Sequence, residues 1–368
     1  MQVVAGCYNP IMNGDLGKQY LKSYIQETNT EYEQFLDGEV KKAAEISKIP
    51  AEMLKRFSKT ALRGKRVRGS LMQLGYEVAG GVDGESIQTA SFSVELVHAG
   101  LLVHDDIMDR DDTRRGLISM HRQYEELGRA LRVVDPEHFG VSLAIDVADA
   151  VYYTSMKVLL DSNFPAENVL AAAKIYAEYA IRTAHGQALD VATITLQSLS
   201  EKDILQVIKY KSAEYTGVMP FLMGAALAGM SDMDRINGMR EYAYAFGWAF
   251  QIQDDILGLY GEQESVGKPI GSDIQEGKNT LLMLKLFEMG TDEDRAFLKM
   301  TLGKEDVSIE EIRQMRERVK KSGAYQSVYD IGMKYVDEGI THVTTITKDT
   351  RLQETLESLI VYMMERAV

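Results

Sequence analysis

The segment SIQTASFSVELVHAGLLVHDDIM, residues 86–108, indicates the fold of this chain. Apolar or small side chains recur in it at helical intervals over several turns, which is typical of a long buried helix. Similar long patterns begin at residues 168, 201 and 236. The chain has only six prolines in 368 residues, so little interrupts such helices. We therefore expect an all-α fold of about a dozen helices, arranged as one large bundle.

Composition and charge narrow the class of protein. Hydrophobic residues make up 45% of the chain and charged residues 26%, as in ordinary globular proteins. A formal net charge of −14 argues against nonspecific nucleic-acid binding and against a basic membrane-surface patch. The single cysteine, Cys7, excludes a disulfide framework and a cysteine-based zinc site. No signal-peptide pattern or run of about 18 apolar residues occurs, so we expect a soluble, cytoplasmic protein without a transmembrane segment.

No linker divides the chain into two parts. Breaks between helical patterns fall at residues 79–86, 133–140, 161–168 and 261–279. The last is the longest and is polar and glycine-rich, and long loops of this kind are often functional. We interpret residues 21–368 as one domain and residues 1–20 as an N-terminal arm.

Two acidic motifs follow apolar helical patterns. In the first, DDIMD, Asp105, Asp106 and Asp109 are three and four residues apart and share one helix face. Carboxylate oxygens are the ligands that Mg²⁺ prefers, and a cation between them would relieve their repulsion. In the second, QDDILG, Asp254 and Asp255 lie near a helix end, where acidic residues oppose the macrodipole. We predict that the two motifs form the two walls of one metal-binding cleft.

Basic residues accompany both motifs. The segment LRGKRVRG (62–69) is either a basic helix start or a clamp for a diphosphate, which arginine binds in bidentate fashion. His98 lies two helical turns before Asp105 on the same face. The candidate cations are Arg63, Lys65, Arg66, Arg68, Arg114, Arg115, Lys211, Lys268 and Lys278. The sequence has no serine-histidine-aspartate arrangement and no glycine-rich nucleotide loop, so the residues favour diphosphate chemistry beside an apolar cavity.

Five segments in order resemble the trans-isoprenyl diphosphate synthase family, which includes farnesyl and geranylgeranyl diphosphate synthases. They are GKRVRG (64–69), ELVHAGLLVHDDIMDRDDTRRG (95–116), GQALD (186–190), KSAEY (211–215) and the stretch 250–280. The ordered set covers roughly residues 60 to 285 and is highly specific, although each piece alone is not. The resemblance implies an all-α bundle of the isoprenoid synthase type with a central apolar cavity, and a homodimer.

The resemblance also implies a Mg²⁺-dependent prenyltransferase. It would condense isopentenyl diphosphate with an allylic diphosphate (dimethylallyl, geranyl or farnesyl) in 1'-4 head-to-tail fashion. The five aspartates would hold Mg²⁺, and Arg114, Lys211 and Lys268 would neutralise the leaving diphosphate. The implied positions for isopentenyl diphosphate are Lys65, Arg68, His98 and Arg115; Ser212, Gln251 and Lys278 lie among the substrate-binding positions, and Gln187 near the metals.

The segment that follows the first motif divides into parts. Asp111 and Asp112 fall off the helical spacing and are interpreted as solvated loop acids. Arg114 and Arg115 would each bind a different diphosphate rather than act as counter-charges to the aspartates. The second motif departs from the family's usual DDxxD, because Gly258 replaces the third aspartate. We interpret this as a tolerated variant; the alternative is a poor catalyst or a regulatory subunit.

In this family, product length depends on residues four and five positions before the first motif, here Leu101 and Gly100. Many short-chain members carry an aromatic residue at the second of these positions, so Gly100 leaves that level open. A lower floor would come from Tyr152, Tyr153 or Met156. We predict a C20 product, geranylgeranyl diphosphate, with farnesyl or longer polyprenyl diphosphates as alternatives.

Three other classes are disfavoured. A class I terpene cyclase needs a second metal motif with Asn, Ser and Glu and has no use for a second diphosphate clamp. A head-to-head synthase of the squalene or phytoene type does not suit the GKRVRG and RRG elements. A non-catalytic partner subunit would not need five retained aspartates.

Overall fold

The computed structural model describes residues 13–366, apart from 83, 194–199, 262–270 and 305. Its first helices are α1 (Asp15–Ile46), α2 (Lys48–Ala61), α3 (Val67–Val78), α4 (Gly84–Asp109), α5 (Met120–Leu131), α6 (Pro136–Leu160) and α7 (Ala166–Thr193). The middle of the chain forms α8 (Glu201–Val207), the π-helix η1 (Ile208–Val218), α9 (Met219–Leu227) and α10 (Met233–Tyr260). The remainder forms α12 (Ser272–Gln275), α13 (Leu281–Met289), α14 (Asp292–Thr301), α15 (Ile309–Lys321), α16 (Ala324–Ile346) and α17 (Thr350–Glu365). Strands β1 (Thr113–Arg114) and β2 (Leu117–Ile118) pair in antiparallel fashion.

The all-α prediction is confirmed, but the described residues hold more helices than the dozen expected. One reason is that the pattern beginning at residue 201 is not one helix: it divides into α8, η1 and α9. Helix α1 begins at Asp15, within the segment 1–20 that we assigned to an arm. Its first turn packs on α17, because a Cβ on Gly17 would lie 2.4 Å from the Cα of Leu359. Residues 15–20 are therefore part of the bundle.

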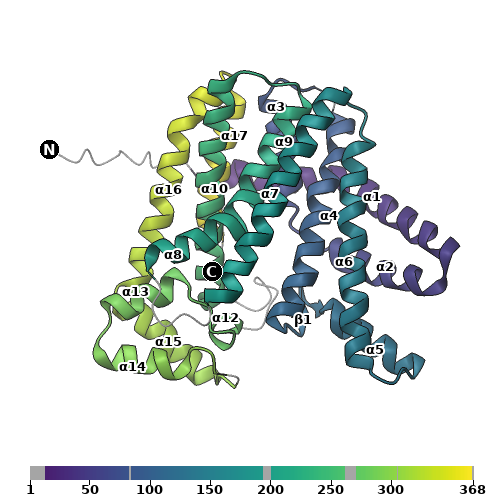
Figure 1. Ribbon diagram of the computed structural model, residues 1–368. Coiled ribbons are helices and arrows are strands. Elements are labelled where there is room, and N and C mark those ends of the chain that lie inside the picture. The colour runs from purple at the N-terminus through teal and green to yellow at the C-terminus, as the bar shows by residue number, and fades with distance from the viewer. Residues whose placement is uncertain (1–12, 83, 194–199, 262–270, 305, 367–368) are drawn as a thin grey trace.

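The long helices α4, α6, α7, α10 and α16 run along one another, with α1 crossing behind them (Figure 1). Helix α10 contacts α16, α17 and η1, whereas α4 contacts α3 and α6. Both α4 and α10 end at the lower side of the bundle in this view, near β1 and α12. This common end brings the two acidic motifs together.

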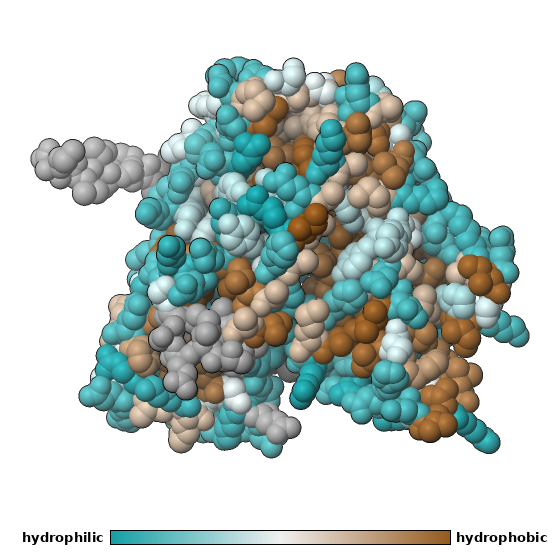
Figure 2. Space-filling model, viewed as in Figure 1, coloured by the Kyte–Doolittle hydropathy of each residue, from teal (hydrophilic) through white to brown (hydrophobic). Residues whose placement is uncertain are grey.

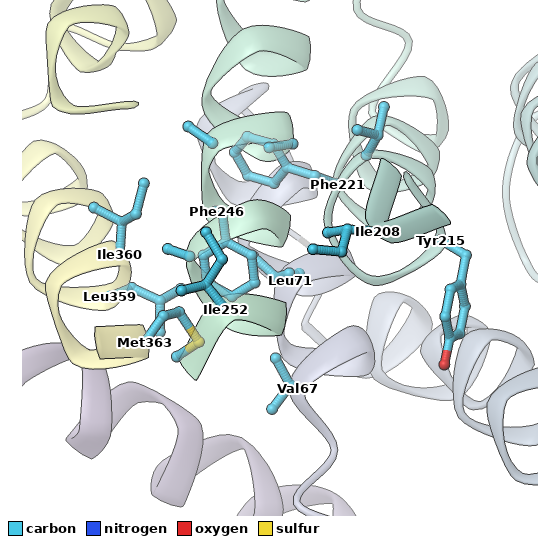
Figure 3. Packing of buried hydrophobic residues seen from close by; sticks show 14 of the residues in the cluster. Val67, Leu71, Ile208, Tyr215, Phe221, Phe246, Ile252, Leu359, Ile360 and Met363 are labelled. Carbon is cyan, nitrogen blue, oxygen red and sulfur yellow. The ribbon is translucent and has the colours of Figure 1, made fainter. Parts of the chain in front are cut away.

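Two hydrophobic clusters hold the helices. The larger joins α3, η1, α9, α10, α16 and α17, and Figure 3 shows Leu71, Phe246 and Ile360 among its members. The smaller lies between α1, α2, α4, α5 and α6. Among the described helices, none has the length and apolar content that crossing a bilayer requires.

Candidate active site

The first acidic motif occupies the last turn of α4, where Asp106 is buried and Asp109 ends the helix. Arg110 follows with φ 59°, so the chain leaves the helix at once. The hairpin of β1 and β2 then turns back through Arg115 and Gly116, which have φ of 53° and 71°. This turn carries the arginines back toward the aspartates.

Arg114 is the counter-charge of the first motif. Its Nε donates to Asp106 Oδ1 at 2.5 Å, and its Nη2 lies 2.9 Å from Asp111 Oδ2 and 3.5 Å from Asp105 Oδ2. Burial alone would lower the pKa of Arg114, but the carboxylates of Asp106 and Asp105 outweigh it and raise that pKa. Two expectations are therefore wrong. Arg114 is a counter-charge of the aspartates, and Asp111 is not a solvated loop acid but a buried partner of Arg114 with 7% exposure. Asp112 is solvated as expected, with 73% of its side chain exposed.

Two lysines contact the other carboxylates of this wall. Lys211 Nζ lies 3.2 Å from Asp105 Oδ1, and Lys278 Nζ lies 3.2 Å from Asp109 Oδ2. Gln187 Nε2 also donates to Asp105 Oδ1, at 3.1 Å. Burial would lower the pKa of each lysine, but the neighbouring carboxylates outweigh it and raise both values. Both ammonium groups stay charged and positioned over the acidic motif.

The π-helix η1 presents Lys211, Ser212 and Tyr215 to the site. Extended π-helical runs are rare and frequently mark functional sites. Neighbouring backbones approach η1 closely, since a Cβ on Gly186 would lie 2.3 Å from the Lys211 nitrogen, and one on Gly247 would lie 2.6 Å from the Cα of Ala213. Glycine on α7 and α10 is what allows η1 to lie between these helices.

The second acidic motif lies near the end of α10. Gln251 Nε2 donates to Asp255 Oδ1 at 2.8 Å, and Arg366 Nη1 donates to Asp254 Oδ1 at 2.7 Å. Burial raises the pKa of Asp255 to about 8; the Gln251 hydrogen bond lowers it, and the charges of Asp273 and Asp254 raise it further. Burial therefore favours the protonated form of Asp255, and a bound cation would favour the carboxylate.

Arg366 is a site residue that the sequence analysis did not identify. It follows the last turn of α17, with a side chain that is only 7% exposed. Its Nη2 donates to the Phe250 carbonyl oxygen at 2.7 Å, and its guanidinium lies 4.2 Å from the centroid of the Phe250 ring. No local pattern identifies it, because Asp254 lies 112 positions away in the chain.

A basic cluster forms a third side of the site. Arg115 Nη2 lies 3.2 Å from His98 Nε2, and Tyr215 Oη lies 3.2 Å from His98 Nδ1. Arginine can only donate, so Nε2 accepts and Nδ1 carries the proton that it donates to Tyr215. Burial, followed by the charges of Arg68 and Arg115, keeps the pKa of His98 well below its ordinary value. Arg68 lies 4.2 Å from the centroid of the Tyr215 ring and donates to Thr216 Oγ1 at 2.7 Å. Figure 3 shows Tyr215 at the edge of the hydrophobic cluster with its hydroxyl pointing away from it.

The cations of segment 62–69 line one cavity but differ in their other contacts. Arg66 is buried, donates to Thr28 Oγ1 at 3.3 Å and Asn29 Oδ1 at 2.7 Å, and lies 4.7 Å from the centroid of the Tyr32 ring. These contacts connect the start of α3 to α1, and Arg66 also lines the cavity. Lys65 and Arg68 line the cavity as expected.

One cavity of about 680 Å³ joins these groups, a size within the usual range for a ligand site. Its polar lining includes Lys65, Arg68, His98, Asp105, Arg114, Arg115, Lys211, Ser212, Gln251, Asp254, Asp255, Asp273, Lys278 and Arg366. Its apolar lining includes Leu102, Ile204, Val207, Ile208, Phe250 and Leu257. The two acidic motifs therefore face one cleft, as predicted. Lys268 lies outside the described residues.

The donor set fits a hard divalent cation. Carboxylate oxygens predominate on both walls, as such ions prefer. Oxygens of Asp109, Asp111 and Glu276 also lie within 4.8 Å of one another. Sequence spacing did not identify Glu276, because it reaches the first motif only through the fold of the segment after α10.

Comparison with known proteins identifies the family. Residues 51–319 match the family model described as polyprenyl synthetase. The chain belongs to the polyprenyl synthetase family. This prenyltransferase is 28% identical over 330 residues to the geranylgeranyl diphosphate synthase of Sulfolobus acidocaldarius, covering 89% of this chain and 92% of that protein. It is 33% identical over 264 residues to the short chain isoprenyl diphosphate synthase of Methanocaldococcus jannaschii, covering 71% and 74%.

A solved structure of geranylgeranyl pyrophosphate synthase from Corynebacterium glutamicum, complexed with isoprenyl diphosphate and magnesium, has a similar fold. Its TM-score is 0.89 at 30% identity, and the alignment covers 94% of this chain and 99% of that one. The bundle of this prenyltransferase is therefore of the isoprenoid synthase type, as the resemblance implied.

The residues expected to set product length lie where α4 meets α6. The Tyr152 ring occupies the level beside Gly100, since a Cβ on Gly100 would lie 2.7 Å from Tyr152 Cε1. That level is therefore filled rather than open. Tyr153 is 79% exposed, so its proposed place in the floor is wrong: one step along a helix turns a side chain by about 100°. Leu101 is half-buried against the larger hydrophobic cluster.

Proposed function

We propose that this prenyltransferase makes geranylgeranyl diphosphate by condensing isopentenyl diphosphate with an allylic diphosphate. One observation carries the proposal: two acidic helix ends and a separate basic cluster face a single cavity with an apolar lining. Two negatively charged substrates need two different sets of partners. The acidic side, through bound cations, suits one diphosphate, and the basic cluster suits the other.

Asp105, Asp106, Asp109, Asp254 and Asp255 would hold Mg²⁺. The site's oxygen donors support this choice, as does the magnesium in the similar Corynebacterium structure. When bound, Mg²⁺ would supply positive charge that stabilises a departing diphosphate.

The chain's own cations share that task. Arg114, Lys211 and Lys278 surround the first motif at 2.5–3.5 Å from its carboxylates. We assign them to the allylic diphosphate, whose C–O bond breaks to leave an allylic cation. Charges fixed in place before the reaction need no reorganisation as negative charge develops, which is the usual origin of electrostatic catalysis.

The basic cluster would position isopentenyl diphosphate. The guanidinium groups of Arg68 and Arg115 can bind its phosphates in bidentate fashion. His98 is neutral and accepts from Arg115, so we assign it to orienting Arg115. The double bond of the bound substrate then attacks the allylic cation to form the new C–C bond, and a proton is lost to the departing diphosphate.

Tyr152, whose ring lies beside Gly100, is our candidate for the residue that sets product length. The half-buried Tyr152 ring contacts both hydrophobic clusters, and its Oη is hydrogen-bonded to His104 Nδ1 at 3.1 Å. We propose that this ring limits growth at C20. A farnesyl or a longer product is the alternative, and the size of the product decides between them.

We also propose a homodimer in the cytoplasm. Exposed apolar side chains lie along α6 and α7, namely Ile145, Tyr153, Leu160, Leu170 and Ile181, and Figure 2 shows hydrophobic atoms over these helices. A second copy would cover them. Light scattering after size exclusion measures the assembly, and a monomer at micromolar concentration would refute it.

A direct assay tests the activity. Purified protein with Mg²⁺, isopentenyl diphosphate and each of dimethylallyl, geranyl and farnesyl diphosphate should give a C20 trans product, identified by chromatography and mass. Cyclised hydrocarbon would instead indicate a terpene cyclase. An absence of elongation with every primer would indicate a non-catalytic subunit.

A further inference from the structure

Glu214 is a buried carboxylate on η1 that the proposed reaction does not use. Its exposure is 0%. Four other residues of η1 line the cavity, namely Ile208, Lys211, Ser212 and Tyr215. The Glu214 side chain instead points to the two helices that enclose η1, where its hydrogen-bond partners lie.

Those partners come from both neighbouring helices. Arg182 of α7 binds both oxygens of Glu214: its Nε donates to Oε2 at 2.6 Å and its Nη2 donates to Oε1 at 2.5 Å. Tyr244 Oη of α10 donates to Oε1 at 3.0 Å. A bidentate arginine fixes the orientation of a carboxylate as well as its distance. Glu214 therefore ties η1 to α7 and to α10 in one defined orientation.

Stability alone does not account for a buried charge in this place. Taking two charges out of water is costly, and apolar residues of similar volume often stabilise a fold equally well. The better-attested use of a buried ion pair is to select one arrangement among several. A π-helix has such an alternative, because its i→i+5 hydrogen bonds compete with the commoner i→i+4 pattern of the α-helix. A change between the two would rotate the side chains of η1 about its axis.

The surfaces that carry these partners also hold the η1 backbone next to Lys211. Gly186 lies one turn after Arg182 on α7, and a Cβ on it would lie 2.3 Å from the Lys211 nitrogen. Gly247 lies about one turn after Tyr244 on α10 and approaches η1 from the other side. A shift of η1 against either helix would therefore displace Lys211.

We propose that Glu214 is a positioning residue for Lys211. It fixes the rotation of η1, so that Lys211 Nζ stays 3.2 Å from Asp105 Oδ1 and 2.5 Å from Asp190 Oδ2. This inference rests on the proposed function, because it concerns the ammonium group that we assign to the allylic diphosphate. Glu214 acts through η1 and touches no substrate.

Titration calorimetry of the full chain with inorganic diphosphate in the presence of Mg²⁺ measures this role without catalysis. Glu214→Gln keeps the shape of the side chain and removes its charge. It should weaken diphosphate binding by about ten- to a hundred-fold, the usual loss when a residue that orients a binding group is changed. Lys211→Met should lose at least as much. In the double variant, Glu214→Gln should add no further loss, because both changes remove one interaction.

A milder pair of variants provides the control. Tyr244→Phe removes one hydrogen bond of the carboxylate and keeps the ion pair, so it tests the inference even if Glu214→Gln folds poorly. It should weaken diphosphate binding by about two- to tenfold. Tyr242→Phe also removes a tyrosine hydrogen bond of α10, the one to the Leu356 carbonyl oxygen at 2.7 Å. That bond faces α17, so its loss should leave diphosphate affinity unchanged. The melting temperature of each variant shows that it is folded.

Three results would overturn the inference: wild-type diphosphate affinity in folded Glu214→Gln, an equal loss from this change in the Lys211→Met background, or equal effects of Tyr244→Phe and Tyr242→Phe. The condensation assay on the wild-type protein separates them from the proposed function. Condensation together with wild-type diphosphate binding by Glu214→Gln would reject only the role of Glu214. The expected binding pattern without any condensation would support that role and reject the reaction.

Discussion

Replacing Arg366 by alanine should destabilise the metal-free protein and make it respond more strongly to Mg²⁺. The side chain makes three hydrogen bonds, to Asp254 Oδ1 and the Phe250 carbonyl oxygen at 2.7 Å and to the Met363 carbonyl oxygen at 3.0 Å. Its loss leaves Asp254 without this partner, but 38% of that side chain is exposed, so water compensates in part. We expect a cost of about 2–3 kcal/mol.

For a chain of 368 residues, that cost lowers the melting temperature by about 3–4 °C. Arg366 and a metal ion compete for the Asp254 carboxylate, so millimolar Mg²⁺ should stabilise Arg366→Ala by more degrees than it stabilises the wild type. Arg366→Lys should lie between the two, because lysine keeps the charge but cannot donate to Asp254, Phe250 and Met363 at once.

Scanning calorimetry with EDTA and with Mg²⁺ measures both effects. Arg351→Ala, which changes an exposed arginine on the same helix, is the matched control and should shift stability by no more than about 0.5 kcal/mol. Equal Mg²⁺ increments in Arg366→Ala and wild type would refute the competition.

Three further perturbations test other parts of the site. Without Mg²⁺, the raised pKa of Asp255, about 8, stabilises the protein fully below the unfolded pKa of about 4, and this stabilisation is lost as the pH rises to about 8. Urea unfolding across this range should therefore show a free energy of unfolding that falls with pH in the wild type but not in Asp255→Asn. Equal pH dependence in the two proteins would contradict this prediction. Tyr152→Ala should lengthen the product by at least one isoprene unit, as chromatography of the products would show, whereas Tyr153→Ala, on the exposed side of α6, should not. Arg66→Met should cost about 2 kcal/mol of stability and leave the KM for isopentenyl diphosphate unchanged. Arg68→Lys should raise that KM with little loss of stability. Steady-state kinetics that show the reverse pattern would contradict these two assignments.

The sequence predicted the helices and the two acidic walls because both depend on local spacing. Residues three and four apart share a helix face, so Asp105, Asp106 and Asp109 converge wherever α4 lies. The residues that the sequence did not place correctly depend on the rotation of a side chain about its helix axis or on contacts between distant segments. Tyr152 and Tyr153 differ only by the turn between consecutive helical residues. Arg366 reaches Asp254 only because α17 packs beside α10.

The misinterpretation of Arg114 has a similar origin. Its position depends on the left-handed residues of the hairpin, Arg115 and Gly116, and spacing alone does not reveal which way the chain turns. The division of segment 201–229 has another cause. A π-helix preserves the apolar face while changing its period, so the pattern favoured one continuous helix.

The chain's own ion pairs also explain how a dense acidic cleft can fold. Each carboxylate of the first motif contacts a cation of the chain: Arg114 binds Asp106, Lys211 binds Asp105, and Lys278 binds Asp109. On the second wall, Arg366 binds Asp254, and burial raises the pKa of Asp255. A magnesium diphosphate would bring both signs of charge, so the aspartates would bind the metal while Arg114, Lys211 and Lys278 would bind the phosphates. Because the same cations would bind either the aspartates or the phosphates, the stability of the protein and its affinity for ligands depend on one set of charges. Removing any one cation should therefore change both the stability of the metal-free protein and its response to Mg²⁺.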